Sequence, residues 1–339
     1  METRVGAIFE QGQQSIKVPI SVFIRSNASV AGTKEGQGPF GENYDVVGID
    51  DKFGCDTWEE AESTLQKEAL QLAIGKSELS NSEIKYLFAG DLLGQSIASS
   101  FGLASFEIPL IGVYGACSTC GLSLAMATIM IAGGMAEHAA CVTSSHFASA
   151  EKEFRFPLGY GNQRPLSATW TATGSGAFVL SSVKSDNDKA RVAGITIGKI
   201  VDFGLKDSLN MGACMAPAAC DTIYRNLMDF DRKPSDYDKI ITGDLGSVGQ
   251  KVLWDMMREK GMDISKVHMD CGMEIYGASQ DMHAGGSGCG CSALVLSAYI
   301  LKQLNEGKWK RVLFVPTGAL LSKTSFNEGQ SIPGIAHAV

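Results

Sequence analysis

The chain has 339 residues, of which 45% are hydrophobic and 19% are charged, and its formal net charge is −8 at pH 7. This length and composition predict a large buried core in one large α/β unit or two domains. The negative charge argues against a general nucleic-acid surface, so we expect no nucleic-acid partner. Nine cysteines in a chain of this size indicate free thiols in a reducing compartment.

An uncharged run between Glu107 and Glu137 is long enough to span a bilayer. Glycines interrupt it, and Cys, Ser and Thr gather at its middle. We therefore interpret it as a strand, a turn and a buried helix, and predict no transmembrane segment. The first residues, METRVGAIFEQGQQ, also lack the apolar segment of a signal peptide.

Two parts of the chain follow the same pattern. Apolar strands end in Gly90-Asp91-Leu92 and Gly243-Asp244-Leu245, and glycine-rich turns at 115–117 and 285–289 each open an apolar helix. Alternating helices and strands predict an α/β protein of two duplicated α-β-α halves, residues 1–185 and 186–339, with mostly parallel or mixed sheets. Halves related by a pseudo-twofold axis would aim both helix starts at one central cavity, where a negative charge is favoured.

Cys117 lies in the first of the two glycine-rich turns, Gly115-Ala116-Cys117-Ser118-Thr119. Unpaired N–H groups and the positive end of a helix dipole favour a thiolate at this place. Such a cysteine acts as a nucleophile or forms part of an anion site. The Cys117–Cys120 spacing also fits a redox pair, and Cys289 and Cys291 would add zinc ligands. Neither spacing is specific, so we expect no metal and no cofactor.

Two histidines and two arginines are candidates for contact with an anion. His146 and His337 follow predicted strand ends, where each would either donate an N–H to a carboxylate ligand or be satisfied by a backbone carbonyl. Arg155 and Arg164 flank a Pro/Gly-containing loop, 156–165, that we interpret as a lid. Each arginine would either pair with a carboxylate or remain solvated. Candidates for a flat apolar wall are Phe147, Phe154 and Tyr160.

Several segments resemble the thiolase fold. The turn around Cys117 is similar to its nucleophile turn, 173–177 (TGSGA) to the segment that ends its first half, and 317–322 (TGALLS) to its C-terminal glycine loop. Nearly the whole chain resembles a narrower family, the stage V sporulation protein AD family of spore-forming bacteria. The segments that carry this resemblance are 115–119 (GACST), 144–146 (SSH) with 155–157 (RFP), 213–219 (ACMAPAA), 242–245 (TGDL), 284–292 (AGGSGCGCS) and 335–337 (IAH).

The resemblance implies a protein that binds dipicolinic acid, pyridine-2,6-dicarboxylic acid, with or without calcium. It implies uptake of this ligand into the forespore and its release during germination, at the forespore or spore inner membrane, beside integral membrane subunits. The thiolase fold implies a homodimer, with strand 139–143 near the interface. The expected ligand-binding residues are Cys117, Ser118, His146, Arg155, Arg164, Asp244, Ser287 and His337.

The condensing enzymes of this fold use a His–His or His–Asn pair from the second half to move protons and to hold the thioester oxygen. At the matching places this chain has Asp244 and the turn Gly286-Ser287-Gly288. An ionised aspartate opposes the charge that develops on an oxyanion. We therefore expect a non-catalytic binding protein without catalytic residues. The alternative is a cysteine-dependent acyltransferase with Cys117 as its nucleophile.

Overall fold

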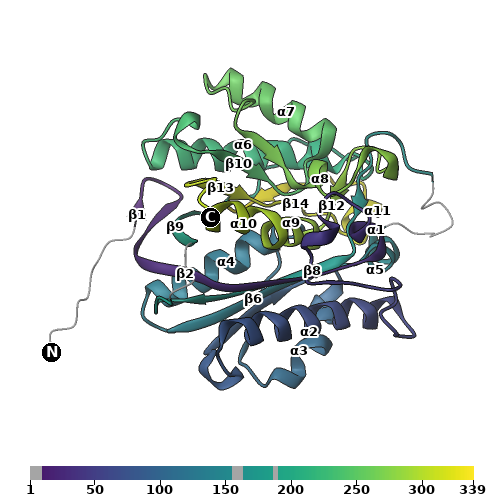
Figure 1. Cartoon of the computed structure of the whole chain (residues 1–339). Coiled ribbons are helices and arrows are strands. Elements are labelled where there is room, and N and C mark those ends of the chain that lie inside the picture. The colour runs from purple at the N-terminus through teal and green to yellow at the C-terminus, as the bar shows by residue number, and fades with distance from the viewer. Residues whose placement is uncertain (1–9, 155–162, 186–189) are drawn as a thin grey trace.

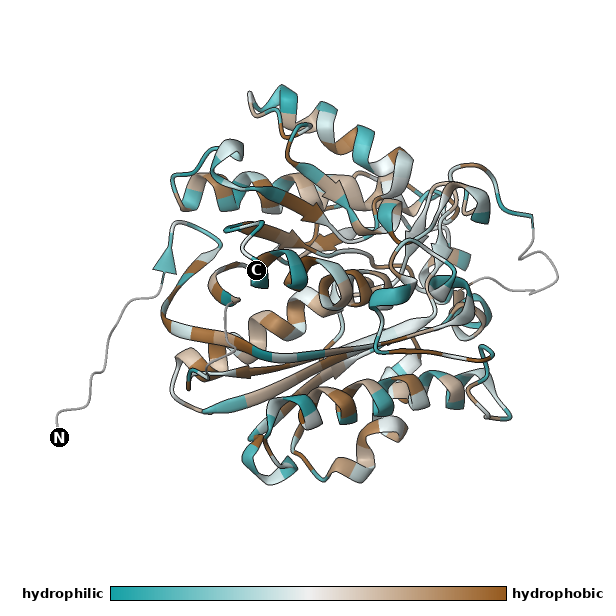
Figure 2. Ribbon diagram, viewed as in Figure 1, coloured by the Kyte–Doolittle hydropathy of each residue, from teal (hydrophilic) through white to brown (hydrophobic). Residues whose placement is uncertain are grey.

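The structure, a computed structural model, describes residues 10–154, 163–185 and 190–339. Two β-sheets enclose a central layer of helices, and further helices cover the outer face of each sheet (Figure 1). Apolar residues, brown in Figure 2, concentrate in the strands and on the covered sides of the helices, whereas the outer helices carry polar residues toward solvent. The predicted alternation of helices and strands thus forms an α-β-α-β-α arrangement.

The first sheet is mixed. Its strands β4, β5 and β6 are parallel, and β8 is antiparallel to both of its neighbours, β6 and β2. Short strands β3 (Val46–Val47) and β9 (Arg191–Thr196) also pair with β2. In order across the sheet, its main strands are β1 (Glu10–Gln11), β2 (Ser15–Ala31), β8 (Gly174–Ser181), β6 (His138–Ser145), β4 (Tyr86–Gly90) and β5 (Leu110–Gly112).

The position of β6 corrects one expectation. We expected residues 139–143 near a dimer interface, but β6 lies between β4 and β8 and these residues are at most 1% exposed. Among the described strands, β1 and β5 end the order, and Leu110 of β5 is 44% exposed. Only an edge strand has unpaired backbone groups to offer, so β5, and not β6, can pair with a second sheet.

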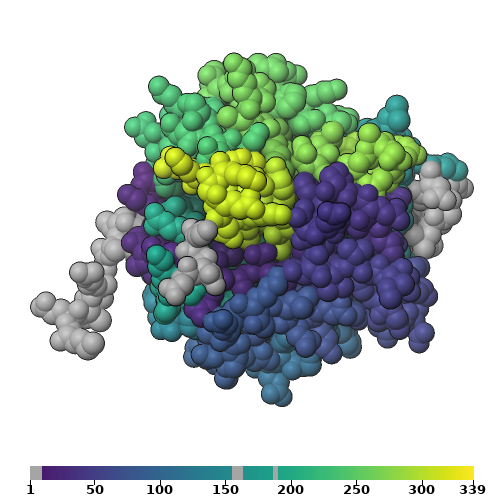
Figure 3. Space-filling model, in the orientation of Figure 1, coloured from purple at the N-terminus to yellow at the C-terminus, as the bar shows by residue number. Residues whose placement is uncertain are grey.

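The second sheet repeats the order of the first. Its parallel strands are β11 (His268–Asp270), β10 (Lys239–Thr242) and β13 (Val312–Val315). The chain end then adds an antiparallel segment, because Val339 exchanges two backbone hydrogen bonds with Phe314, and Ala338 exchanges two with Thr196 of β9. The order β11, β10, β13, chain end, β9 matches β5, β4, β6, β8, β2. In Figure 3 the last residues, in yellow, accordingly lie between the two halves.

The helices divide among three layers. Helices of the outer layers are α2 (Trp58–Ser77) and α3 (Ile97–Leu103) on the first sheet, and α6 (Met211–Asp229) and α7 (Gly246–Glu259) on the second. The central layer holds α4 (Thr119–Ala132) and a helix that runs from α9 (Cys289–Val295) through a π-helical turn (Leu296–Ile300) to α10 (Leu301–Asn305). Shorter elements are α1 (Thr33–Gly36), α5 (Phe147–Phe154), β7 (Trp170–Thr171), α8 (Cys271–Glu274), β12 (Gly286–Ser287), β14 (Thr317–Ala319), α11 (Lys323–Asn327) and β15 (Gly334–Ala336).

The uncharged run 108–136 forms β5, a turn and α4, as we interpreted it from the sequence. Among the described residues, no helix combines the length and the apolar character needed to cross a bilayer. The apolar residues of α4 instead pack between the two sheets, in the same core as β6 and β8.

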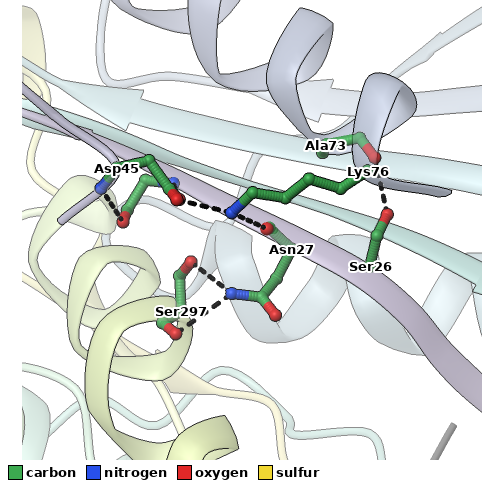
Figure 4. A network of polar contacts seen from close by, with 7 residues as sticks. Ser26, Asn27, Asp45, Ala73, Lys76 and Ser297 are labelled. Carbon is green, nitrogen blue, oxygen red and sulfur yellow. Dashed lines mark hydrogen bonds and ion pairs between the residues drawn. The ribbon is translucent and has the colours of Figure 1, made fainter. Parts of the chain in front are cut away.

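Polar contacts fasten β2 to the helices on both of its faces (Figure 4). Ser26 donates to the carbonyl of Ala73 in α2 at 2.6 Å. Asn27, which points to the other face, donates its amide N–H groups to the Ser297 carbonyl at 3.0 Å and hydroxyl at 2.8 Å. Neighbouring strand residues point to opposite faces, so this dipeptide joins the outer helix layer to the central one.

Removal of the Asn27 amide should destabilise the protein. We expect Asn27→Ala to lower the free energy of unfolding by about 1–3 kcal/mol, because both bonds to Ser297 are lost inside the fold. Lys76→Gln, which removes the exposed Lys76–Asp45 ion pair of the same network, should cost less than about 1 kcal/mol. Urea denaturation of both variants measures the difference. Equal losses would contradict the importance assigned to the Asn27 contacts.

Candidate functional site

The turn that carries Cys117 joins β5 to α4 and is closed by its own hydrogen bonds. The Ser118 hydroxyl donates to the Gly115 carbonyl at 2.6 Å, and the Thr119 hydroxyl donates to the Ala116 carbonyl at 2.5 Å. Ala116 has a φ of +49°, a left-handed conformation that is unfavourable for alanine. The hydroxyl of Ser118, which we predicted to contact ligand, is therefore used within the turn, and the residue is fully buried.

Segments of the second half pack directly on this turn. A Cβ atom at Gly318 would lie 2.3 Å from the Gly115 carbonyl oxygen, and one at Gly121 would lie 2.7 Å from the His337 carbonyl oxygen. Both glycines are required by these close approaches. The C-terminal glycine loop that we identified in the sequence thus contacts the cysteine turn.

Asp244 lies at the centre of the site, in the turn between β10 and α7. Its Oδ1 accepts the Thr317 hydroxyl at 2.6 Å, and its Oδ2 accepts the Gly288 N–H, at the start of α9, at 3.0 Å. The Cys117 thiol also donates to this carboxyl group. Burial raises the pKa of Asp244 to about 7, although the three hydrogen bonds act in the opposite direction. Thr317, which the sequence analysis did not single out, is part of the site.

The predicted thiolate at Cys117 is wrong. Burial raises the pKa of this thiol well above its usual range, and the charges of Asp244 and Cys289 raise it further. The Gly288 N–H is the group that acts in the other direction. Cys117 is only 7% exposed and precedes the first residue of α4 by two positions. Helix N–H groups favour a thiolate, but burial and the neighbouring carboxyl group act in the opposite direction here and are larger.

The structure separates the two candidate histidines. His146 is anchored by the backbone, because its Nε2 lies 2.7 Å from the Asp51 carbonyl and its Nδ1 accepts the Ala148 N–H at 3.1 Å. Burial lowers its pKa. This is the backbone-satisfied arrangement that we weighed for His146, with both ring nitrogens occupied.

His337 keeps one nitrogen for other contacts. Its Nδ1 accepts the Gly198 N–H at 3.3 Å, which leaves the proton of the neutral ring on Nε2. Burial lowers its pKa to about 4, so the ring is neutral near pH 7. Its Cδ2 atom, next to Nε2, would lie 3.7 Å from a Cβ atom at Gly115. The Nε2–H donor is therefore on the side of the cysteine turn.

Arg164 belongs to an aromatic stack. Its guanidinium lies 4.7 Å from the Trp170 ring centroid and donates to the Asp281 carbonyl at 3.3 Å. Lys34 lies 4.1 Å from the same ring, on which Phe147 stacks at 3.7 Å. Arg155, Tyr160 and most of the predicted lid lie outside the described residues.

Two aromatic residues, Tyr114 and Phe154, lie near Cys117. Phe154 packs on a cluster of Leu92, Cys117, Ala150 and Cys289. Tyr114 is 47% exposed, and its phenol is close enough to Cys117 and Cys289 for their charges to raise its pKa, after the larger effect of burial. Ser287 is 4% exposed and is held in β12, which pairs with β7. Tyr114 and Phe154 therefore lie close to Cys117, and Tyr114 is in contact with solvent.

A buried acidic network lies behind Cys289. The Cys289 thiol donates to the Ser144 carbonyl at 2.8 Å, and the Ser144 hydroxyl donates to Glu62 at 2.9 Å. Gln66 donates to the Ser144 and Ser99 hydroxyls, and Ser99 donates to Asp91 at 2.6 Å. Burial, and then the charge of Asp91, raise the pKa of Glu62 to about 8. Near pH 7 the carboxyl group of Glu62 is therefore protonated, and burial also raises the pKa of Asp91.

The sequence contained a signal for this network that we did not use. Glu62 and Gln66 fall on the same face of helix 58–77 as Ala69, Leu70 and Ala73, and all of these residues are buried. Polar residues within the apolar stripe of a helix require buried partners. The serines that supply the partners lie on strand β6 or on other helices, so their identity depends on the tertiary fold.

The network makes stability depend on pH. Unfolding returns Glu62 to an ordinary pKa near 4.5, so above that pH the unfolded chain releases a proton that the native protein keeps up to about pH 8. Native stability from this group is complete below pH 4.5 and is lost as pH rises toward 8. The free energy of unfolding of Glu62→Gln should therefore rise relative to that of the natural chain, by on the order of a few kcal/mol from about pH 5 to pH 8.

Urea denaturation across this pH range measures the gain. Glu83→Gln, at an exposed carboxylate outside the network, is the control and should show no such trend. A difference between Glu62→Gln and the natural chain that stays constant with pH would contradict a protonated Glu62.

Within the described ranges, no three His, Cys, Asp or Glu side chains are grouped to hold a metal ion. All nine cysteines are free thiols, including Cys117 and Cys120.

Comparison with known proteins gives two kinds of similarity. The family model for stage V sporulation protein AD matches residues 12–339. A stage V sporulation protein AD from Bacillus subtilis (strain 168) is 42% identical over 330 residues, which cover 97% of this chain and 96% of that protein.

Solved structures share the fold at low sequence identity. The 3-oxoacyl-[acyl-carrier-protein] synthase III of Aquifex aeolicus VF5 has a TM-score of 0.56 and 13% identity, covering 94% of this chain and 100% of that one. The tetronic acid condensing enzyme AbyA1 has a TM-score of 0.56 and 15% identity, with coverage of 93% and 99%. Cerulenin-bound OleA of Xanthomonas campestris has a TM-score of 0.55 and 15% identity, with coverage of 94% and 96%. These similarities confirm the predicted thiolase-like fold.

Proposed function

Because the chain belongs to the stage V sporulation protein AD family, we propose that it binds dipicolinic acid at the Cys117 site without catalysis, for uptake into the forespore and release during germination. Family membership supports a role in sporulation. The ligand, its transport and the absence of catalysis are the proposal.

The contact between Cys117 and Asp244 carries the proposal of a non-catalytic site. Condensation by a cysteine needs a thiolate and neutral or cationic donors around the thioester oxygen. Here the thiol is protonated and its partner is a carboxyl group. His146, which we considered as a donor, is bound on both nitrogens by the backbone.

The same contact sets a condition for binding a dicarboxylate. A ligand anion placed beside ionised Asp244 would meet repulsion in a water-poor site. A proton on Asp244 or a calcium ion brought with the ligand removes this repulsion. The Nε2–H of His337, the arginines Arg155 and Arg164, and Ser287 are the proposed contacts to the ligand, with Phe154 as an apolar wall.

We expect the affinity for dipicolinate without calcium to fall as pH rises. Asp244 is protonated below about pH 7, so the affinity should be level there and decrease by up to about tenfold per pH unit above it. Asp244→Asn, which cannot ionise, should remove this dependence, and calcium should weaken it. Titration calorimetry at several pH values measures the affinity, with the exposed Asp263→Asn as the matched control.

Two outcomes would contradict the proposal. One is the absence of both heat and thermal stabilisation at millimolar dipicolinate. The other is a covalent acyl adduct after incubation with acyl-CoA thioesters, seen in the intact mass and lost in Cys117→Ser. This second outcome would establish the alternative, a cysteine-dependent acyltransferase. One observation favours that alternative: Ala116, directly before Cys117, has a left-handed conformation that holds the cysteine in a fixed turn.

We also propose that the protein is a homodimer and acts at the forespore or spore inner membrane with integral membrane subunits. The free edge of β5 supports the dimer, since Leu110 is exposed there. Leu110→Lys should convert a dimer to a monomer in light scattering, because a charge on an edge strand blocks pairing. Leu166→Lys, at another exposed leucine, should leave the mass unchanged. A monomeric natural chain, or no co-purification with integral membrane proteins from spores, would contradict the assembly.

A further inference from the structure

A cavity of about 750 Å³ lies away from Cys117, where β1, β9, α10 and the last residue of the sequence come together (Figure 1). Its volume is within the range of small-molecule sites. Lys310 and Arg311 line it just before β13, whereas Thr317 of the Cys117 site follows β13. From Arg311 to Thr317 the chain advances six residues, which span on the order of 20 Å when extended. The cavity and the Cys117 site therefore lie at opposite ends of the second sheet.

Basic side chains surround this cavity, and no acidic side chain of the described residues lines it. Within the same part of the chain, no carboxylate side chain forms an ion pair with any of the five cations, which are Lys17, Arg191, Arg232, Lys310 and Arg311. Asp238 lies nearby but accepts the backbone N–H groups of Lys310 and Arg311, at 2.7 and 2.9 Å. The charge of Asp238 acts on Lys310 and Arg311 and offsets part of their positive charge. Five cations around a space that no acidic side chain of the described residues lines still favour the entry of an anion.

Arg232 is held in place before any ligand binds. Its Nη1 donates to the Tyr237 hydroxyl at 2.8 Å, and its guanidinium lies 4.9 Å from the Phe230 ring centroid. Tyr237 in turn donates to Asn226 at 2.6 Å, and Asn226 donates to Thr196 at 2.8 Å. A guanidinium has five N–H donors, so this chain of contacts orients the group and leaves others for a ligand.

The floor of the cavity is apolar. Half-buried apolar side chains line it, among them Ile24 of β2, Leu304 of α10 and Val312 of β13, and these form the apolar lining that a ligand can reach. Trp309 stands at the wall beside the basic residues. A small inorganic anion would leave this apolar surface in contact with water, whereas a ligand with an apolar body would cover it.

We propose that this cavity is an anion-binding site separate from the Cys117 site, and that its ligand is an organic anion with an apolar body. The acidic head, a carboxylate or a phosphate, contacts Arg232 and the neighbouring cations, and the body lies on the apolar lining formed by Ile24, Leu304 and Val312. This site goes beyond the proposed function, because it requires neither Cys117 nor Asp244.

Titration calorimetry on the full chain tests the site with four probes: decanoate, decyl phosphate, acetate and decanol. We expect saturable binding of decanoate or decyl phosphate, and at least about tenfold weaker binding of acetate, which lacks the body, and of decanol, which lacks the charge. The comparison of decanoate with decyl phosphate distinguishes the two head groups.

Charge variants locate the binding. Arg232→Gln/Arg311→Gln should weaken binding at least about tenfold, and Lys310→Gln/Arg311→Gln, at exposed positions outside the Tyr237 contact, should weaken it in the same direction without loss of folding. Lys67→Gln/Lys251→Gln, which makes the same change in net charge at positions on α2 and α7, should have no effect. Cys117→Ser should also have no effect.

The proposal is overturned if neither long-chain anion binds saturably, if the control pair weakens binding as much as the cavity pairs, or if Cys117→Ser abolishes binding. Titration with dipicolinate distinguishes this proposal from the proposed function. Failure of dipicolinate to bind while decanoate binds would reject the proposed function and support this site.

Discussion

The carboxyl group of Asp244 connects segments from both halves of the protein. It accepts hydrogen bonds from Thr317 of β14 and from the Gly288 N–H at the start of α9, and it receives the thiol of Cys117 from the first half. Two helix starts meet here, as the duplication predicts, and such a place favours a negative charge. The protein places a carboxyl group of its own chain there, and the three hydrogen bonds to this group oppose the rise in pKa that its burial causes.

This arrangement determines how easily the groups around Cys117 ionise. In a buried site the thiol of Cys117 and the carboxyl of Asp244 compete for protons, and burial raises the pKa of both. The neighbouring Glu62 and Asp91 add further acidic groups whose pKa values burial also raises. The interior around Cys117 thus contains acidic groups that burial makes harder to ionise, rather than a positively charged pocket. An anion that enters it needs a proton or a cation to accompany it.

The opposite end of the second sheet is basic rather than acidic. Arg232, Arg311 and the cations near them surround a cavity that no acidic side chain of the described residues lines and that has a partly apolar lining. The two ends of the same strands therefore differ in what they would bind. At the Cys117 end the binding that we propose would depend on protonation, whereas at the basic cavity it would depend on fixed positive charge that changes little near neutral pH.

The sequence by itself determined the local pattern: the strand, turn and helix around Cys117, the repeated order of elements, and the family. These follow from apolar periodicity and glycine positions, which act over a few residues. Only the tertiary structure decided the state of the site, because Asp244 reaches Cys117 from the other half and Asp51 takes the Nε2 of His146. Burial and charge, which set a pKa, come from residues far apart in the chain, and no spacing along the sequence reveals them.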